Sequence, residues 1–238
     1  MAEVVTTSPA HPVRVWLNGQ MVDAEAAKLP HLTHSFHYGL AAFEGVRAYD
    51  IAGGQGAVFR LREHMDRLIR SCHLTTLDKG LQWNAEQLGQ ACVQTLQANG
   101  LRSGYLRPVV YIQDGAMGIG AKDNPIGVLI AAWKWGAYLG EEGLQRGINA
   151  CISSFSRPNH SAVMSKAKIN GHYVNSILAK REAMANGYDE AILLSQQGYV
   201  CEASGENLFM VLDGKLITPP LSLNILAGIT RASVLQLA

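Results

Sequence analysis

The chain has 238 residues, of which 48% are hydrophobic and 16% are charged, and this balance is typical of a globular protein with a substantial core. Its 20 basic and 19 acidic residues give a net charge of +1 at pH 7. That charge offers no electrostatic case for a nucleic-acid partner or an anionic membrane surface. The class of binding partner that remains is a small-molecule ligand.

The cysteines and histidines show no spacing that is typical of a metal site. The four cysteines lie far apart without a CxxC pair, which also argues against a disulfide framework, and the histidines form no HxxxH or HxH pattern. We therefore expect no metal and a reducing, cytoplasmic environment. The longest apolar run, residues 126–133, is far below the ~20 residues of a membrane helix, and residues 1–16 do not resemble a signal peptide.

The N-terminal part predicts a hairpin and two helices. Residues 13–17 and 20–24 flank the dipeptide Asn18-Gly19, which favours a tight hairpin turn. After a loop, the apolar residues of 61–72 recur at helical spacing. A second helix is predicted from Asn84, a good N-cap, to Asn99.

Two long strands follow. Residues 104–112 alternate, so that Tyr105 and Arg107 share one face and Leu106 and Val110 the other, and residues 127–133 read as a buried strand. Glycines and charges then interrupt the apolar runs, and we expect a linker between two domains at 134–145. The expected domains are 1–133 and 146–238.

The second domain predicts strands in hairpins and two helices. The expected elements are a strand near 148–155, a helix at 172–186, the strand pairs 191–195 with 199–203 and 207–212 with 215–219, and the start of a helix in 228–238. Antiparallel hairpins with separate helices indicate an α+β fold rather than a doubly wound sheet. Because this helix stops at the last residue and the domain is short beside the first, we expect a C-terminal portion to be missing.

Several residues suit chemistry, and the pattern alone leaves their roles open. Lys166 and Lys168 are either solvated surface lysines or include a nucleophile, and Glu202 is either a turn carboxylate or a working acid. Arg67 on the polar face of its helix is either a ligand of an anion or a solvated residue paired with Glu63.

Two further features have the same ambiguity. The helix start at Gly228 and Thr230 presents unpaired N–H groups that bind phosphate readily, or it is simply N-capped by Thr230. Tyr105 and Arg107 form either a carboxylate clamp or a surface pair.

The order of the motifs is more informative than any one of them. Along the chain come "HYGLAAFEGVRAY", "REHMDRL", "YLRP", "WGAYLG", "KINGHYVNSILAKREA", "GYDEAILLS", "GYVCEASGENLF" and "LAGITR". From about residue 14 to the end this series resembles the branched-chain amino acid aminotransferases. These are class IV enzymes of fold type IV that use pyridoxal 5′-phosphate (PLP) and have a smaller N-terminal α/β domain and a larger C-terminal domain.

The resemblance implies a role for each matching position around the cofactor. The lysine five residues before the tyrosine of "KINGHY", Lys168, is the one that the family links covalently to PLP, and Lys166 falls outside the motif. Glu202 matches the carboxylate at the pyridine nitrogen, and Tyr173 matches the contact to the phenolic oxygen. The implied phosphate ligands are Arg67 and the N–H groups of Ile229 and Thr230.

The resemblance also implies substrates. Aromatic residues form an apolar pocket for leucine, isoleucine or valine, and the arginine of the YxR strand receives the side-chain carboxylate of glutamate, so that the amino group passes to 2-oxoglutarate. The implied substrate residues are Tyr38, Phe43, Tyr105, Arg107 and Tyr138. Since family members build their sites at subunit interfaces, a homodimer or larger assembly is implied.

Alternatives from the same fold are a D-amino acid aminotransferase and a lyase, and a non-catalytic binding protein is a third. The YxR pair favours the branched-chain subgroup. The sequence departs from the family at "INGHY", which replaces a double glycine, and a C-terminal loop that helps to bind the phosphate and the substrate carboxylate in the family has no counterpart before Ala238.

Overall fold

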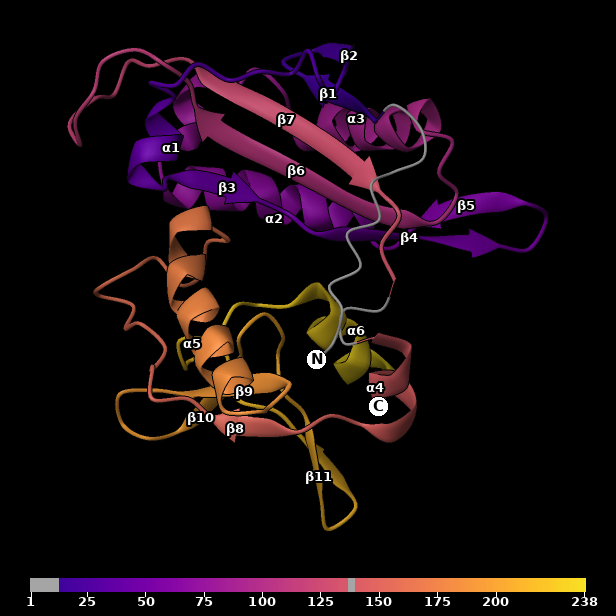
Figure 1. The fold of residues 1–238 in the computed structure, drawn as a ribbon, viewed down its shortest axis with the longest axis vertical. Coiled ribbons are helices and arrows are strands. Elements are labelled where there is room, and N and C mark those ends of the chain that lie inside the picture. The colour runs from indigo at the N-terminus through magenta and orange to yellow at the C-terminus, as the bar shows by residue number, and fades with distance from the viewer. Residues whose placement is uncertain (1–12, 137–139) are drawn as a thin grey trace.

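The first half of the chain forms a single seven-stranded antiparallel sheet in the computed structural model, which describes residues 13–136 and 140–238 (Figure 1). Its strands are β1 (Arg14–Leu17), β2 (Gln20–Asp23), β3 (Ala41–Phe43), β4 (Val46–Ile51), β5 (Gln55–Val58), β6 (Gly104–Ile112) and β7 (Ile126–Trp133). The order across the sheet is β2-β1-β7-β6-β4-β5, with β3 also paired to β6. The predicted hairpin and the two long strands are confirmed.

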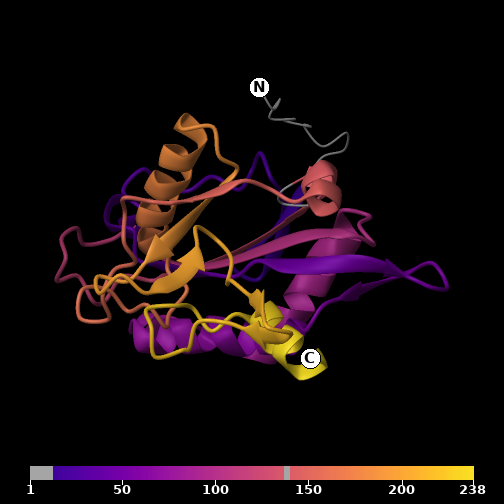
Figure 2. The ribbon, with the colours of Figure 1, turned by 90° about the horizontal axis from the view of Figure 1, so that it is seen from below.

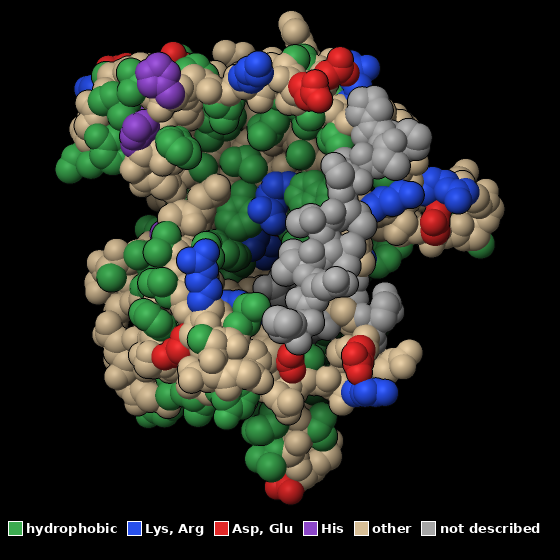
Figure 3. All heavy atoms as spheres, viewed as in Figure 1, with side chains coloured by type: hydrophobic (Ala, Val, Ile, Leu, Met, Phe, Trp, Pro, Cys, Tyr) green, Lys and Arg blue, Asp and Glu red, His purple; other side chains and the backbone are tan. Residues whose placement is uncertain are grey.

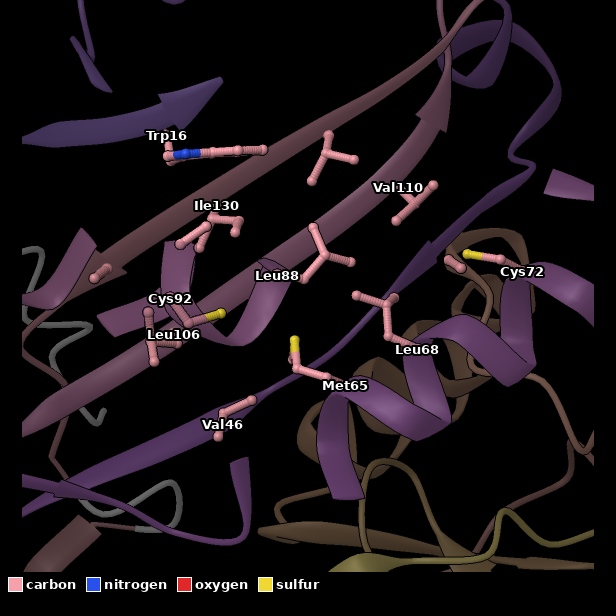
Figure 4. Close-up of a cluster of buried hydrophobic side chains, with 14 of the residues drawn as sticks. Trp16, Val46, Met65, Leu68, Cys72, Leu88, Cys92, Leu106, Val110 and Ile130 are labelled. Atoms are coloured by element: carbon pink, nitrogen blue, oxygen red, sulfur yellow. The ribbon is translucent and has the colours of Figure 1, made fainter. Parts of the chain in front are cut away.

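Helices α2 (Leu61–Leu74) and α3 (Ala85–Ala98) cover one face of this sheet, and the main core lies between them and the strands (Figure 4). Met65 and Leu68 from α2 and Leu88 from α3 are fully buried there. As the sequence predicts, Asn84 caps α3, and its side chain and that of Gln87 bond reciprocally to each other's backbone N–H.

The expected loop before residue 61 is wrong. The structure places helix α1 (His34–Tyr38) and strands β3, β4 and β5 in this stretch. These elements are short, and β3 has three residues that find their hydrogen-bond partners on β6, far along the sequence. Such pairing leaves little local periodicity, which explains why the sequence pattern does not predict it.

The described residues of the second half contain two small sheets and three α-helices. They are α4 (Gly140–Arg146), β8 (Ala150–Ile152), α5 (Tyr173–Ala185), β9 (Glu190–Leu194), β10 (Val200–Ala203), β11 (Met210–Leu212), β12 (Lys215–Ile217) and α6 (Ile229–Leu237). β9–β10 and β11–β12 are antiparallel as predicted, whereas β8 and β9 pair in parallel, with α5 in the connection between them. The α+β fold class is confirmed.

The two halves meet along the segment that follows Ala167 (Figures 1 and 2). The N–H of Phe43 donates to the carbonyl of Lys168 at 3.0 Å, and the N–H of Gly171 donates to the carbonyl of Gly39 at 2.9 Å. Gly39 has a φ of +74°, and a Cβ on Gly171 would lie 3.1 Å from the carbonyl oxygen of Gly39, so this close approach suits glycine at both positions. The lysine segment is therefore anchored to the edge of the first sheet.

No helix in the described residues is long and apolar enough to cross a lipid bilayer.

Candidate active site

A cavity of about 400 Å³ lies between the two halves of the molecule. Figure 3 shows it as a hollow with Lys or Arg side chains inside. Its lining combines residues from both halves, among them seven predicted site residues: Arg67, Tyr105, Lys168, Tyr173, Glu202, Ile229 and Thr230. Residues that are up to 163 positions apart in sequence, Arg67 and Thr230, are thus brought to one place.

Lys168 reaches this cavity from the segment anchored on β3. Its backbone N–H donates to the hydroxyl of Ser71 on α2 at 3.0 Å, and its ammonium donates to the hydroxyl of Tyr173. The ammonium also lies 4.6 Å from the centroid of the Phe43 ring. The two aromatic rings and the backbone contacts hold the amine in place at the cavity wall.

Lys166 has a different environment from Lys168. Its ammonium donates to the carbonyl of Leu221 and lies 3.5 Å and 3.4 Å from the carbonyls of Leu223 and Ile225. Burial lowers its pKa, although Glu202 opposes this. Neither lysine is a freely solvated surface residue, and Lys166 stabilises the loop at 221–225.

Glu202, at the end of β10, is a buried carboxylate with partners on both oxygens. Oε1 lies 2.9 Å from a terminal nitrogen of Arg157, while Oε2 accepts from the side-chain amide of Asn207 and the N–H of Leu226, each at 3.1 Å. Burial raises the pKa of Glu202, against the opposing effects of Arg157, the Leu226 N–H and Lys168. Because Oε2 already accepts two bonds, Oε1 keeps a lone pair for a donor in the cavity.

Arg67 is held by a second buried carboxylate. Its Nε donates to Oε1 of Glu44 at 2.6 Å and its Nη2 to Oε2 at 2.8 Å, while Nη1 donates to the carbonyl of Ala227 at 2.9 Å. The alternative pairing with Glu63 is wrong, since Glu63 pairs with Arg60 at 2.8 Å.

Glu44 is fully buried, and Nδ1 of His64 lies 2.8 Å from its Oε2. Burial acts to raise the pKa of Glu44, but the hydrogen bonds from Arg67 and His64 outweigh it and lower the pKa to about 2. The group is therefore a carboxylate at any working pH.

The start of α6 lies next to Arg67. The backbone N–H groups of the first helical turn, including Ile229 and Thr230, have no partners within the helix. No side chain caps this end, so the expected alternative of a Thr230 cap is not what the structure has. A Cβ on Gly228 would lie 2.0 Å from Oδ1 of Asn207, which explains glycine at this position.

The predicted substrate residues are only partly gathered at the cavity. Tyr105 lines it, and Nη2 of Arg107 donates to the Tyr105 hydroxyl at 3.1 Å, so the YxR pair forms a unit. The Arg107 guanidinium lies 4.9 Å from the centroid of Phe43, and its buried Nε has no hydrogen-bond partner. Tyr38 on α1 is 44% exposed and packs on His34, and Tyr138 lies outside the described residues.

Three residues of this site are missed by sequence reasoning: Glu44, His64 and Arg157. Glu44 has a signal, because it is a single charge within the apolar stretch 40–46, and an acid in such a place is buried with a partner. His64 and Arg157 have no comparable signal. In the described part of the chain, no group of three or more His, Cys, Asp or Glu side chains is placed to hold a metal ion.

Comparison with known proteins agrees with this geometry. The sequence matches the family model described as amino-transferase class IV over residues 41–238, more than half of the chain. It is 44% identical over 224 residues to a branched-chain-amino-acid aminotransferase of Pseudomonas aeruginosa, covering 94% of this chain and 72% of that protein.

Solved structures agree with the sequence matches. The crystal structure of the Escherichia coli branched-chain amino acid aminotransferase superposes with a TM-score of 0.92 at 41% identity, covering 96% of this chain and 74% of that one. The branched-chain aminotransferase of the thermophilic archaeon Thermoproteus uzoniensis, solved with norvaline, gives a TM-score of 0.90 at 44% identity, covering 96% and 75%. With the family match, the identity and the shared fold taken together, the chain belongs to the class IV aminotransferases.

Proposed function

We propose that this aminotransferase transfers the amino group of L-leucine, L-isoleucine or L-valine to 2-oxoglutarate, giving the branched-chain 2-oxo acids and L-glutamate. The observation that carries the proposal is the convergence of the Lys168 ammonium and the buried Glu202 carboxylate on one cavity. The relatives named as branched-chain aminotransferases support the choice of substrates.

The cofactor of this family is PLP, and the residues around the cavity fit it. An amine for covalent attachment (Lys168), an anion-binding end (Arg67 and the start of α6) and a buried acid with a spare lone pair (Glu202) line the same space. A volume of about 400 Å³ lies within the usual range for small-molecule sites. PLP, when bound, supplies an electron sink for the electron pair left behind when the α-proton of the amino acid departs.

Each residue then has a distinct task. The N–H groups of Ile229 and Thr230, together with Arg67, would bind the phosphate. The ionised Glu202 would keep the pyridine nitrogen of the cofactor protonated. Tyr173 orients the Lys168 amine through its hydroxyl. Nζ of Lys168 acts as the base that takes the proton from the α-carbon of the substrate and holds it for return.

The YxR pair serves the substrate side. Phe43 offers an apolar face to a branched side chain, and the adjacent guanidinium of Arg107 has an unpaired buried Nε for the second carboxylate of glutamate. Tyr105, to which Arg107 is bonded, lines the cavity, so both substrates would bind on this side of the site. Tyr38 and Tyr138 complete the proposed substrate set.

We extend the proposal to organisation and location. The first sheet ends with β7 at Trp133 and the later sheets begin with β8 at Ala150, which supports a small domain at 1–133, a linker at 134–145 and a cofactor-binding domain at 146–238, although the linker is not purely a loop, since α4 occupies Gly140–Arg146. The free thiols of all four cysteines fit a cytoplasmic enzyme. Strongly exposed apolar residues such as Phe36 and Ile119 support a homodimer or larger assembly.

The lysine assignment is tested with a matched pair of variants, Lys168→Ala and Lys166→Ala. Reductive trapping followed by peptide mass spectrometry is expected to place the cofactor on residue 168 in the wild type and in Lys166→Ala. In Lys168→Ala the cofactor is expected to remain unattached and turnover to fall by several orders of magnitude. Trapping on Lys166 in any of these proteins would contradict the assignment.

The substrate class is tested by assaying L-leucine, L-isoleucine, L-valine and D-alanine with 2-oxoglutarate. Activity with the three L-amino acids is expected. Turnover confined to D-alanine would replace the proposal with a D-specific aminotransferase.

A further inference from the structure

The guanidinium of Arg67, next to the start of α6, is held by hydrogen bonds to groups outside the cavity. Of the five N–H donors of a guanidinium, Nε and one N–H of Nη2 go to Glu44, and one N–H of Nη1 goes to the carbonyl of Ala227. One N–H therefore remains on each terminal nitrogen. The side chain of Arg67 is 14% exposed and lines the cavity, so these two donors are the ones available to an anion.

Glu44 does not line the cavity, and its side chain is 0% exposed. It sits between β3 and β4, where its neighbour Phe43 is paired to β6, so its position is fixed by the first sheet. Nδ1 of His64 also bonds to Oε2 and prevents the carboxylate from rotating. The plane of the Arg67 fork is thereby set by the sheet rather than by a ligand.

Stability alone does not require an ion pair at this position. A buried ion pair is often no more stabilising than an apolar pair of the same size, because both charges lose their hydration. A guanidinium that is already held in one orientation at the cavity wall, however, loses little side-chain conformational entropy when it binds an anion. We propose that Glu44, supported by His64, is a positioning residue that pre-orients Arg67 for the cofactor phosphate.

This inference rests on the proposed function, because it takes Arg67 as a phosphate ligand. It also predicts that loss of the Glu44 carboxylate weakens phosphate binding, which is the opposite of what charge alone predicts. Removal of a negative charge near a phosphate would strengthen phosphate binding by charge alone. Loss of the fork's orientation would weaken it. The direction of the change therefore separates the two effects.

The experiment compares PLP with pyridoxal, which lacks the phosphate, by absorbance titration of the apoenzyme. In Glu44→Gln one oxygen of the carboxylate becomes an NH₂ group that opposes an N–H of Arg67. The Kd for PLP is expected to rise about 10- to 100-fold, as when outer partners of metal ligands are removed. The Kd for pyridoxal is expected to stay within about twofold.

Two further variants complete the design. Glu86→Gln makes the same chemical change at an exposed carboxylate in the first turn of α3, away from Arg67 and the start of α6, and is expected to leave both Kd values unchanged. Glu44→Asp keeps the buried charge but shortens the arm that reaches the fork. It is expected to raise the Kd for PLP but not the Kd for pyridoxal. If Glu44→Gln does not fold, Glu44→Asp tests the same prediction.

Equal weakening of PLP and pyridoxal, or tighter binding of PLP, in the Glu44 variants overturns the inference. So does an unchanged ratio of the two Kd values in a folded Glu44→Asp. If the wild type itself binds PLP no better than pyridoxal, it is the phosphate role of Arg67 in the proposed function that fails.

Discussion

At the scale of single residues, two buried carboxylates near the cavity have opposite pKa shifts. Glu44 receives hydrogen bonds from Arg67 and His64, which together outweigh its burial and lower its pKa to about 2. In Glu202 burial prevails and raises the pKa, even though Arg157 lies 2.9 Å away. The first acid is thus permanently charged, whereas the charge of the second depends on its partners.

The charge of Glu202 is predicted to depend on Arg157. In Arg157→Gln the opposing guanidinium is lost, so burial raises the pKa of Glu202 further and more of it is protonated at neutral pH. We expect kcat/KM near pH 7 to fall on the order of 10-fold or more, and the acid limb of its pH profile to move to higher pH. Arg157→Lys keeps the charge and is expected to restore most of the limb. A loss of activity with an unmoved limb would speak against this coupling.

Glu44 is predicted to make stability pH-dependent. Its folded pKa of about 2 lies below the usual 4.5, so its contribution is fully present above about pH 5 and disappears as the pH falls towards 2. The difference corresponds to about 3 kcal/mol of unfolding free energy. Urea unfolding between pH 3 and pH 6 measures most of it, and Glu44→Gln is expected to give a flatter curve. Parallel curves for the two proteins would contradict this prediction.

At the scale of elements, the start of α6 depends on the packing of one glycine. In Gly228→Ala the new Cβ would lie 2.0 Å from Oδ1 of Asn207 and force this side chain to move. Asn207 also donates to Oε2 of Glu202 and to the carbonyl of Leu226, each at 3.1 Å. Displacement of one side chain therefore disturbs both the phosphate end and the acid.

We predict that Gly228→Ala lowers the free energy of unfolding by about 1–3 kcal/mol and weakens PLP binding. Urea unfolding and PLP titration measure the two effects. Gly120→Ala serves as the control, because nothing lies near its Cβ position and its φ is not positive. The control is expected to leave stability unchanged or raise it by up to about 1 kcal/mol. Equal stability and equal PLP affinity in the two variants would refute the prediction.

An element can be predicted from the sequence when the residues that determine it lie within its own segment. Helices α2 and α3 follow from apolar spacing and end signals within their own segments, the end of α5 follows from Gly187, and the hairpins follow from Asn18-Gly19 and Asp213-Gly214. Strands β3 and β4 were not predictable, since these short elements pair with β6, about 60 residues further along the chain, whereas β5 pairs locally with β4 and its hairpin was missed.

The same distinction applies to the site. The positions of Lys168 and Glu202 follow from motifs, but Glu44 reaches Arg67 only after β3 has paired with β6 and α2 has packed on the sheet. The network behind the site is a product of the tertiary fold.

At the scale of the whole molecule, the two halves are joined at the site itself. Arg67 from α2 donates to the carbonyl of Ala227, and Arg60 donates to the carbonyl of Ile229 at 3.2 Å and to the hydroxyl of Ser233 at 2.9 Å. With the lysine segment on β3, these bonds place the start of α6 against α2. A ligand in the cavity therefore contacts both halves at once.

We predict that PLP stabilises both halves together, because each provides ligands, Arg67 from the first and Lys168 from the second. A ligand at 100 times its Kd stabilises the folded state by about 2.7 kcal/mol. All four tryptophans lie at or before residue 135, so tryptophan fluorescence reports mainly on the first half, whereas peptide circular dichroism reports on the whole chain. Both signals are expected to shift to higher temperature by the same amount with PLP, and by less in Lys168→Ala. If circular dichroism shifted while fluorescence did not, the cofactor would be held by the second half alone, and the contribution of Arg67 to binding would have to be abandoned.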